Sequence, residues 1–204
     1  MAFDMGFDYR ATSTFVTDPA YGVPTLGEAY PHTYTNGNGD SINAGWTAGN
    51  LGQQNMASSN DARIAGDNYS AALTEEDFQV DLGSGSNPGA GDYSIDIAVG
   101  QPTNPTQNQF AILDNATTLI TTSGTISVAA NHFVDATLTD VTATTTWTGT
   151  PVTKTFATTT CIVKINLAGA VNNNGMLSHF RLTRQGATAT ATPPKMLMLL
   201  GVGS

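Results

Sequence analysis

Few residues in this sequence have the types and spacing that catalysis or metal binding requires. The three histidines, His32, His132 and His179, are far apart in the chain, and no HExxH or CxxC spacing occurs. His132 and His179 each precede a phenylalanine in a strand-like run, which favours structural strand residues over metal ligands. No GxSxG nucleophile elbow is present. We therefore expect no metal centre built on His or Cys ligands and no serine hydrolase site.

The carboxylates give only one place where acid–base chemistry could be assembled. Glutamate occurs only at Glu28, Glu75 and Glu76. A glycosidase needs two carboxylates that flank the scissile bond, and Glu75–Asp77 together with Asp81 could supply them. The alternative is a solvated loop that leads into a strand, and the sequence favours it. We expect a protein that is not an enzyme and that carries no cofactor.

Trp46 is the most ligand-like residue, because it sits on a glycine-flanked segment. In one interpretation a sugar stacks on its exposed face, while Asp61 and Arg63 bind hydroxyl groups and Tyr69 adds a further contact. In the other, Trp46 packs over the edge of the fold, and Asp61 and Arg63 form a local ion pair that orders their loop. The first interpretation predicts a sugar site at these four residues.

Two short segments are rich in oxygen ligands, Asn36–Asp40 and Asn60–Asp67. Side-chain and main-chain oxygens are what Ca²⁺ prefers, so either segment would suit a structural calcium ion. Ordinary Asx turns explain the same composition. The sequence leaves both interpretations open and predicts no other metal.

The elements that must position these residues are short strands. In Phe78–Leu82 and again in Tyr93–Val99, apolar residues alternate with polar ones, which is the period of a half-buried strand. We read these two runs as antiparallel strands joined by a long turn. Similar runs follow at Gln109–Leu113, Thr118–Thr121, Thr125–Ala129, His132–Val141, Thr144–Thr148, Val152–Thr155, Cys161–Leu167, Leu177–Thr183 and Met196–Leu200.

Many short strands with frequent turns predict an all-β fold, an antiparallel β-sandwich of the jelly-roll, galactose-binding-like kind. Residues 1–75 are rich in Gly, Asn, Tyr and Pro and show little alternation, so we expect one or two early strands and long ordered N-terminal loops there. A short turn of helix is expected near Ser59–Ile64. The 204 residues suffice for one domain, which we place at 1–184, with a C-terminal extension at 185–204.

Composition narrows the class of protein. Charged residues make up only 11% of the chain, while threonine occurs 32 times, which suits the exposed faces of strands. The single cysteine, Cys161, excludes an internal disulfide and is expected in the core. No dense basic patch and no apolar run of transmembrane length occur, so we expect neither nucleic-acid nor membrane binding. MAFDMGFDYR does not read as a secretory signal.

Charge is divided unevenly along the chain. All 16 acidic residues lie at or before Asp140, whereas five of the seven basic residues follow it. If the two segments occupied different faces, the molecule would be polar from end to end and suited to head-to-tail docking. If they interleave in one sandwich, the asymmetry disappears in space.

The early part reads FDMGFDY (Phe3–Tyr9), followed by the Gly45–Trp46 pair, an Asp61-Ala62-Arg63 segment and Tyr69. Next comes the F-x-V-x-L…G-x-Y-x-I-x-I-x-V-G pattern at 78–100, then a strand-like run at 133–138 and a closing strand pair at 161–167 and 177–182. This series resembles the malectin-like and galactose-binding-like β-sandwich modules over about 3–184. The resemblance implies a module that binds sugars or proteins and rarely catalyses a reaction.

Two functions from different classes follow. The leading hypothesis is a non-enzymatic virion structural protein, a capsid decoration or cement protein that is homo-oligomeric and contacts a capsid subunit, located in the virion. Its docking arms would be the two ends of the chain, with the assembly residues Phe3, Phe7, Met196, Leu197, Met198, Leu199 and Leu200. The alternative is an extracellular carbohydrate-binding module that recognises a polysaccharide through Trp46.

Overall fold

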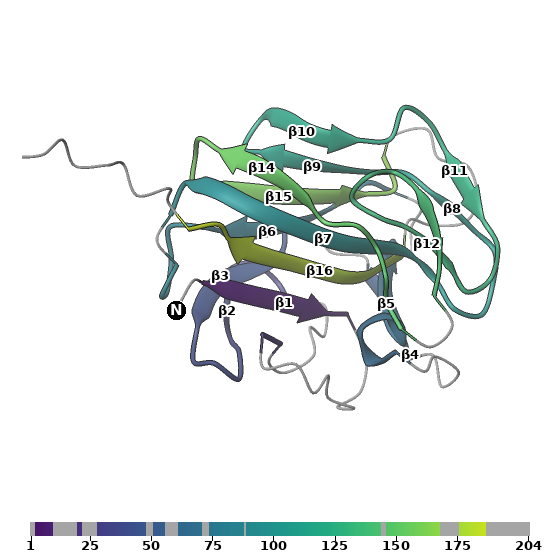
Figure 1. Cartoon of the computed structure of the whole chain (residues 1–204), viewed down its shortest axis with the longest axis horizontal. Coiled ribbons are helices and arrows are strands. Elements are labelled where there is room, and N and C mark those ends of the chain that lie inside the picture. Colours follow the sequence, from purple (N-terminus) through teal and green to yellow (C-terminus); the bar gives the residue numbers. More distant parts are fainter. Residues whose placement is uncertain are drawn as a thin grey trace, which may run out of the picture.

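The computed structural model is an antiparallel β-sandwich (Figure 1). It describes residues 3–9, 20–21, 28–47, 51–55, 61–70, 74–87, 89–143, 146–167 and 176–186. Within these residues the chain forms two facing sheets, a separate two-stranded ribbon and one 3-10 turn, η1 (Ala62–Ile64). The predicted all-β sandwich class and the helical turn near residue 64 are both confirmed.

The larger sheet has eight strands in the described residues, and we call it the large sheet. Its central order is β13-β12-β7-β16-β5-β4, with β1 paired to β16 and β14 paired to β7. The strands are β1 (Asp4–Asp8), β4 (Leu51–Asn55), β5 (Gly66–Ser70), β7 (Gly91–Gln101), β12 (His132–Val134), β13 (Asp140–Thr142), β14 (Val152–Phe156) and β16 (Met176–Arg184).

The facing sheet has six strands in the part of the chain described, in the order β10-β9-β15-β6-β3-β2. We call it the small sheet. Its strands are β2 (His32–Thr35), β3 (Ser41–Trp46), β6 (Glu76–Asp81), β9 (Phe110–Asp114), β10 (Thr117–Thr121) and β15 (Thr160–Ile165). The ribbon pairs β8 (Thr106–Asn108) with β11 (Ile126–Val128).

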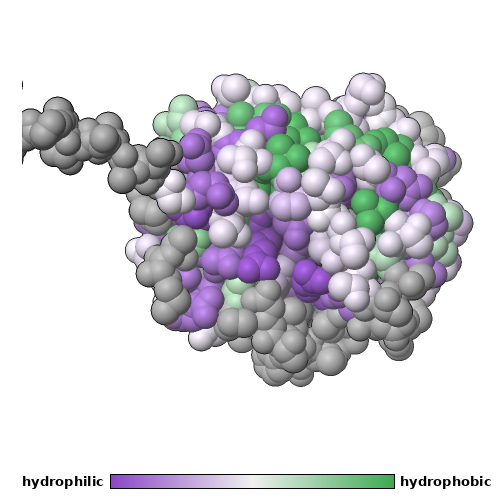
Figure 2. Space-filling model, in the orientation of Figure 1, coloured by the Kyte–Doolittle hydropathy of each residue, from purple (hydrophilic) through white to green (hydrophobic). Residues whose placement is uncertain are grey.

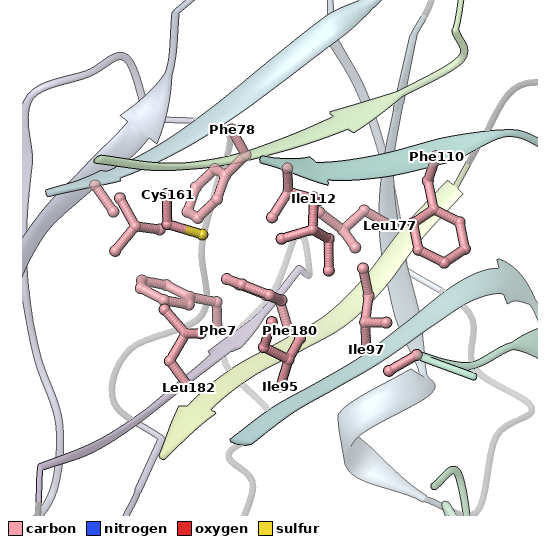
Figure 3. Close-up of a cluster of buried hydrophobic side chains, with 14 of the residues drawn as sticks. Phe7, Phe78, Ile95, Ile97, Phe110, Ile112, Cys161, Leu177, Phe180 and Leu182 are labelled. Atoms are coloured by element: carbon pink, nitrogen blue, oxygen red, sulfur yellow. The ribbon is translucent and has the colours of Figure 1, made fainter. Parts of the chain in front are cut away.

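The hydrophobic core lies between the two sheets and follows directly from period-two alternation. In β6 the side chains are alternately buried and half-buried, and the same pattern holds along β15. Phe78 from the small sheet faces Phe7 and Phe180 from the large sheet, with Cys161 beside them (Figure 3). Cys161 is fully buried, as expected.

The longest ladder joins β7 to β16 at the middle of the large sheet. Its register shifts between Leu177 and His179, where Leu177 pairs with Val99 but His179 pairs with Ala98. Ser178 is the extra residue of this β-bulge, and its hydroxyl donates to the Gly100 carbonyl at 2.7 Å. The bulge keeps Leu177 in the core while turning His179 to the outer face of the sheet.

The sequence interpretation of strand pairing is wrong in two places. The runs at 78–82 and 93–99 do not form a hairpin, because β6 pairs within the small sheet and β7 within the large one. The runs at 161–167 and 177–182 likewise belong to opposite sheets. Alternation shows which residues of a strand face the core. It does not show whether two such strands are neighbours in one sheet or lie in opposite sheets on either side of that core.

The run at 132–141, predicted as one strand, is not continuous. It is a tight hairpin of β12 and β13, with Phe133 opposite Val141. Asp135 reverses the chain, because its Oδ1 accepts hydrogen bonds from the backbone N–H groups of Thr137 and Thr139. Such an Asx turn competes with strand continuation at Asp, Asn, Ser and Thr.

The acidic and basic parts of the sequence interleave in space. Lys164 Nζ lies 2.7 Å from Glu75 and 2.9 Å from Asp77. Arg181 forms an ion pair with Asp4 at 2.5 Å. The interleaved alternative is therefore the correct one, and the charge asymmetry along the chain gives no basis for head-to-tail docking.

Asp67 makes stability depend on pH. Burial raises the pKa of this fully buried carboxyl on β5 to about 8, against ~3.9 in an unfolded chain. The folded state therefore holds the proton more tightly, and stability falls as pH rises from about 4 to about 8. Urea unfolding should show wild-type less stable at pH 8 than at pH 5 by a few kcal/mol, at ~1.4 kcal/mol per pH unit over part of this range.

The variant Asp67→Asn has no carboxyl to ionise, so its stability should stay nearly flat over the same pH range. Asp92→Asn, at an exposed position on β7, is the matched control and should keep the wild-type slope. An Asp67→Asn protein that still loses stability between pH 5 and pH 8 would contradict this assignment.

Candidate functional site

Trp46 is buried in this structure, so the predicted sugar site does not lie on the protein surface. Trp46 ends β3 and is only 3% exposed, with its ring packed against Tyr9 and Phe78 at centroid distances of 6.0 and 5.3 Å. Because a stacking platform needs at least one ring face exposed to the ligand, the prediction that Trp46 stacks on a sugar is wrong. Its side chain points into the core from the small sheet.

Asp61 and Arg63 do come together, in the manner of the alternative interpretation. Arg63 Nη2 lies 2.8 Å from Asp61 Oδ2, and Arg63 Nε donates to Asp61 Oδ1 at 3.1 Å. This local ion pair orders the η1 turn, as that interpretation expected. Tyr69 lies on β5 opposite Met176, in the large sheet, so the structure does not join the four predicted residues into one site.

The predicted N-terminal docking residues belong to the protein's own core. Phe3 and Phe7 are buried, and the Phe7 ring contacts Phe78 and Phe180. The prediction of an N-terminal docking arm is therefore wrong, because β1 pairs with β16 and the side chains of Phe3 and Phe7 point into the core. Met196, Leu197, Met198, Leu199 and Leu200 lie outside the described residues.

Sequence reasoning missed a cluster on the outer face of the large sheet, which we call the outer-face network. Its members are Tyr21, Asp61, Arg63, Asp96, Trp147 and His179. At its centre, His179 Nε2 lies 3.1 Å from Asp96 Oδ2, and the Tyr21 hydroxyl lies 2.8 Å from His179 Nδ1. The indole N–H of Trp147 donates to Asp96 Oδ1 at 2.8 Å. Each contact links residues far apart in the chain.

The same network ties the 3-10 turn to the sheet. The backbone N–H of Trp147 donates to Asp61 Oδ2, and Arg63 Nη2 donates to the Trp147 carbonyl at 3.3 Å. Beneath these polar groups, Ile64, Ala98, Phe133 and Trp147 form a second apolar cluster. The outer face of the large sheet is thus covered by Tyr21, η1 and Trp147 at this end.

The electrostatics of the network follow from burial and its hydrogen bonds. Burial alone would raise the pKa of Asp96, but hydrogen bonds from His179 and Trp147 and the charge of Arg63 outweigh it and lower that pKa. For Asp61, burial is likewise outweighed by hydrogen bonds from Arg63 and Trp147, and its pKa is lowered. Both carboxylates are therefore held in the charged form.

The Tyr21–His179–Asp96 chain has the residue types of a proton relay, but it cannot reach a substrate. His179 is 0% exposed, and Tyr21 is also buried. A general base must come within hydrogen-bond reach of the group it deprotonates. The chain instead fixes the covering segments to the sheet, since satisfied buried polar networks rigidify the structure around them.

Beside the network lies an open row of polar side chains on the same face. Strand pairing places Asp4 opposite Thr183, Thr183 opposite Ser94, and Ser94 opposite Thr153. We call these four residues the polar row. At ~4.8 Å between strands, it crosses four strands and spans roughly 14 Å. Figure 2 shows hydrophilic residues gathered over the part of this face that β16 and β1 occupy in Figure 1.

One end of the polar row is held by an ion pair. Arg181 Nε donates to Asp4 Oδ1 at 2.8 Å, while the Thr183 hydroxyl donates to the same oxygen at 2.9 Å. Burial tends to raise the pKa of Asp4, but its hydrogen bonds to Arg181 and Thr183 lower it overall. Asp4 and Arg181 remain 21% and 23% exposed, so both present polar atoms to solvent in fixed positions.

The described residues give no metal centre. No group of three or more His, Cys, Asp or Glu side chains in them is arranged to hold a metal ion. Asn36 Oδ1 accepts from the backbone N–H groups of Asn38 and Asp40 at 3.0 and 2.9 Å, which is the ordinary Asx turn. Within the same residues, no helix has the length and apolar character needed to cross a membrane.

Comparisons with known proteins place the chain in no family. No protein-family profile matches it, and no curated protein sequence matches it. The malectin-like resemblance therefore finds no support there. Among solved structures, a family 35 carbohydrate binding module from Clostridium thermocellum matches with a TM-score of 0.39 at 9% identity, covering 68% of this chain and 90% of that one.

A family 35 module from Paenibacillus barcinonensis also has a TM-score of 0.39, at 10% identity, covering 69% of this chain and 93% of that one. The isomalto-dextranase of Arthrobacter globiformis T6, complexed with panose, matches with a TM-score of 0.37 at 16% identity. That match covers 69% of this chain and 22% of the enzyme. Likenesses this weak assign neither a family nor a function.

The contact between Gly6 and Tyr21 allows a test of how Tyr21 is held on the outer face of the large sheet. A Cβ atom at Gly6 would overlap the Tyr21 ring, so Gly6→Ala must displace that ring from His179. We expect a loss of about 1–3 kcal/mol in the free energy of unfolding, measured by urea denaturation. Gly124→Ala is the control, because nothing lies within 4 Å of the added atom. Equal stability of the two variants would show that Tyr21 does not pack on β1.

Proposed function

We propose that this protein is a β-sandwich module that binds a carbohydrate on the outer face of its large sheet. The observation that carries the proposal is the polar row, in which a carboxylate and three hydroxyl side chains stand in register across four strands. The Arg181 guanidinium lies beside them. A site on adjacent strands holds its polar groups more precisely than a site on loops.

The chemistry of the row suits a ligand rich in hydroxyl groups. Asp4 is an acceptor held in place by Arg181 and Thr183, whereas the hydroxyls of Ser94 and Thr153 can each donate and accept. A sugar presents the same mixture of donors and acceptors along one face. Because hydrogen bonds already position Asp4, Arg181 and Thr183, binding would cost little ordering entropy at that end of the row.

Every Trp and Phe among the described residues is buried, whereas Tyr30 and Tyr69 are half-buried. The polar row itself contains no aromatic residue on which a sugar could stack. Recognition there would therefore rest on hydrogen bonds. Four such bonds at about 1 kcal/mol each give ~4 kcal/mol, which corresponds to a Kd on the order of 1 mM.

The test uses a panel of soluble polysaccharides and affinity electrophoresis in native gels. Wild-type protein should be retarded by at least one of them. The double variant Ser94→Ala with Thr183→Val, which removes two hydroxyls at similar side-chain volume, should lose that retardation. Thr118→Val, at an exposed position on the opposite sheet, is the matched control and should keep it.

Two results would overturn this proposal. One is an unchanged mobility of the wild-type protein on every polysaccharide. The other is retardation that persists in the Ser94→Ala, Thr183→Val protein, which would place the site elsewhere. Thermal melts of both variants should match wild-type within a few degrees, since neither change enlarges the core.

The role of a virion decoration protein stays a prediction, because no described residue bears on a capsid contact. It requires an assembly in solution that depends on the C-terminal segment. Light scattering of the full chain and of a version ending at Arg184 tests it. A larger assembly that dissociates on truncation supports it, and a monomer in both forms contradicts it.

A further inference from the structure

A second constellation of chemically capable side chains lies on the β12–β13 hairpin, apart from the outer-face network. Pairing places His132 directly opposite Thr142, so their side chains share one face. Asp140 is two residues before Thr142 on β13 and therefore projects from that same face. We call Thr142, His132 and Asp140 the hairpin triad.

The distances within the hairpin triad order the three groups as nucleophile, base and orienting carboxylate. His132 Nδ1 lies 2.8 Å from Asp140 Oδ1, and His132 Nε2 lies 3.4 Å from the Thr142 hydroxyl oxygen. An Nδ1–H that donates to Asp140 leaves the lone pair of Nε2 facing Thr142. This is the arrangement that lets an imidazole accept a hydroxyl proton, and such contacts are often long in a ligand-free protein.

Unlike the buried Tyr21–His179–Asp96 chain, the hairpin triad is open to solvent. The side chains of His132 and Asp140 are 30% and 47% exposed, and Thr142 is exposed. The hairpin is the end of the large sheet, because β13 pairs only with β12 among the described strands. A small molecule can therefore reach the Thr142 hydroxyl.

We infer that the hairpin triad is an acyl-transfer site that takes small activated esters. The Thr142 oxygen forms a bond to the acyl carbon while its proton passes to His132 Nε2. The ester C–O bond breaks. An alkoxide leaving group takes the proton from His132, whereas a phenolate departs as an anion and His132 gives its proton to bulk water. Water then attacks the acyl carbon as its proton passes to His132 Nε2, and that proton moves on to the Thr142 oxygen as the bond to the acyl carbon breaks and the carboxylic acid departs.

The chain supplies a matched control for this inference. His32 is also exposed, and its ring packs against Tyr34 at a centroid distance of 4.7 Å. In the described part of the chain, it makes no hydrogen bond to a carboxylate. Any exposed imidazole cleaves an activated ester slowly, so His32 measures that background. Of these two histidines, only His132 has both an orienting carboxylate and an adjacent hydroxyl.

The experiment follows p-nitrophenolate release from p-nitrophenyl acetate by the full-length protein. We expect Thr142→Val and His132→Gln each to lower the rate by about tenfold or more, since general-base catalysis contributes ~10²-fold or more. Asp140→Asn should also lower it. His32→Gln should stay within about twofold of wild-type. Intact mass and peptide mapping after quenching should find the acetyl group on Thr142 in wild-type protein.

Several outcomes would overturn the inference. These are a Thr142→Val protein as fast as wild-type, a His32→Gln protein that loses as much as His132→Gln, and acetyl groups found only on lysines. The substituted side chains are exposed or half-exposed, so circular dichroism should show all variants folded. Should one variant unfold, the mapped acetylation of the wild-type protein still decides the question.

Discussion

The β-bulge at Ser178 is the constraint on which the rest of the outer face depends. Without the extra residue, strict alternation from Leu177 would send His179 into the core and Phe180 outward. With it, Leu177, Phe180 and Leu182 all face the core, and His179, Arg181 and Thr183 all face outward. One irregularity in the central ladder thus creates both the hydrophobic layer and the polar surface opposite it.

The outer-face network holds together segments that are distant in sequence. A buried histidine and carboxylate are costly unless each is fully hydrogen-bonded, because partial satisfaction leaves a polar group without water. Tyr21 and Trp147 complete the bonds of His179 and Asp96. Tyr21 and Trp147 are therefore held on the large sheet, beside the polar row.

Much of the fold was readable in the sequence, because alternation is a local signal. The strands at 93–99, 152–155 and 161–167 were recognised from it, and so was the sandwich class. Strand pairing could not be predicted from the sequence, because β6 and β7 would show the same alternation whether they were neighbours in one sheet or lay in opposite sheets. The outer-face network was missed because Asp96, Trp147 and His179 become adjacent only through the topology, and the bulge has no local sequence mark. The prediction of a sugar site at Trp46 was wrong because a glycine-flanked tryptophan fits a core position as well as a surface one.

The most direct test of this account is ¹⁵N-resolved NMR of the histidine side chains, read together with solvent exchange. The Nε2–H of His179 should be observed as a slowly exchanging proton hydrogen-bonded to Asp96, and Asp96→Asn or Gly6→Ala should speed its exchange. A His179 ring whose protons exchange as quickly as those of the exposed His32 would contradict it. In that case the bulge would not bury the histidine, and the outer face would lack the network that fixes it.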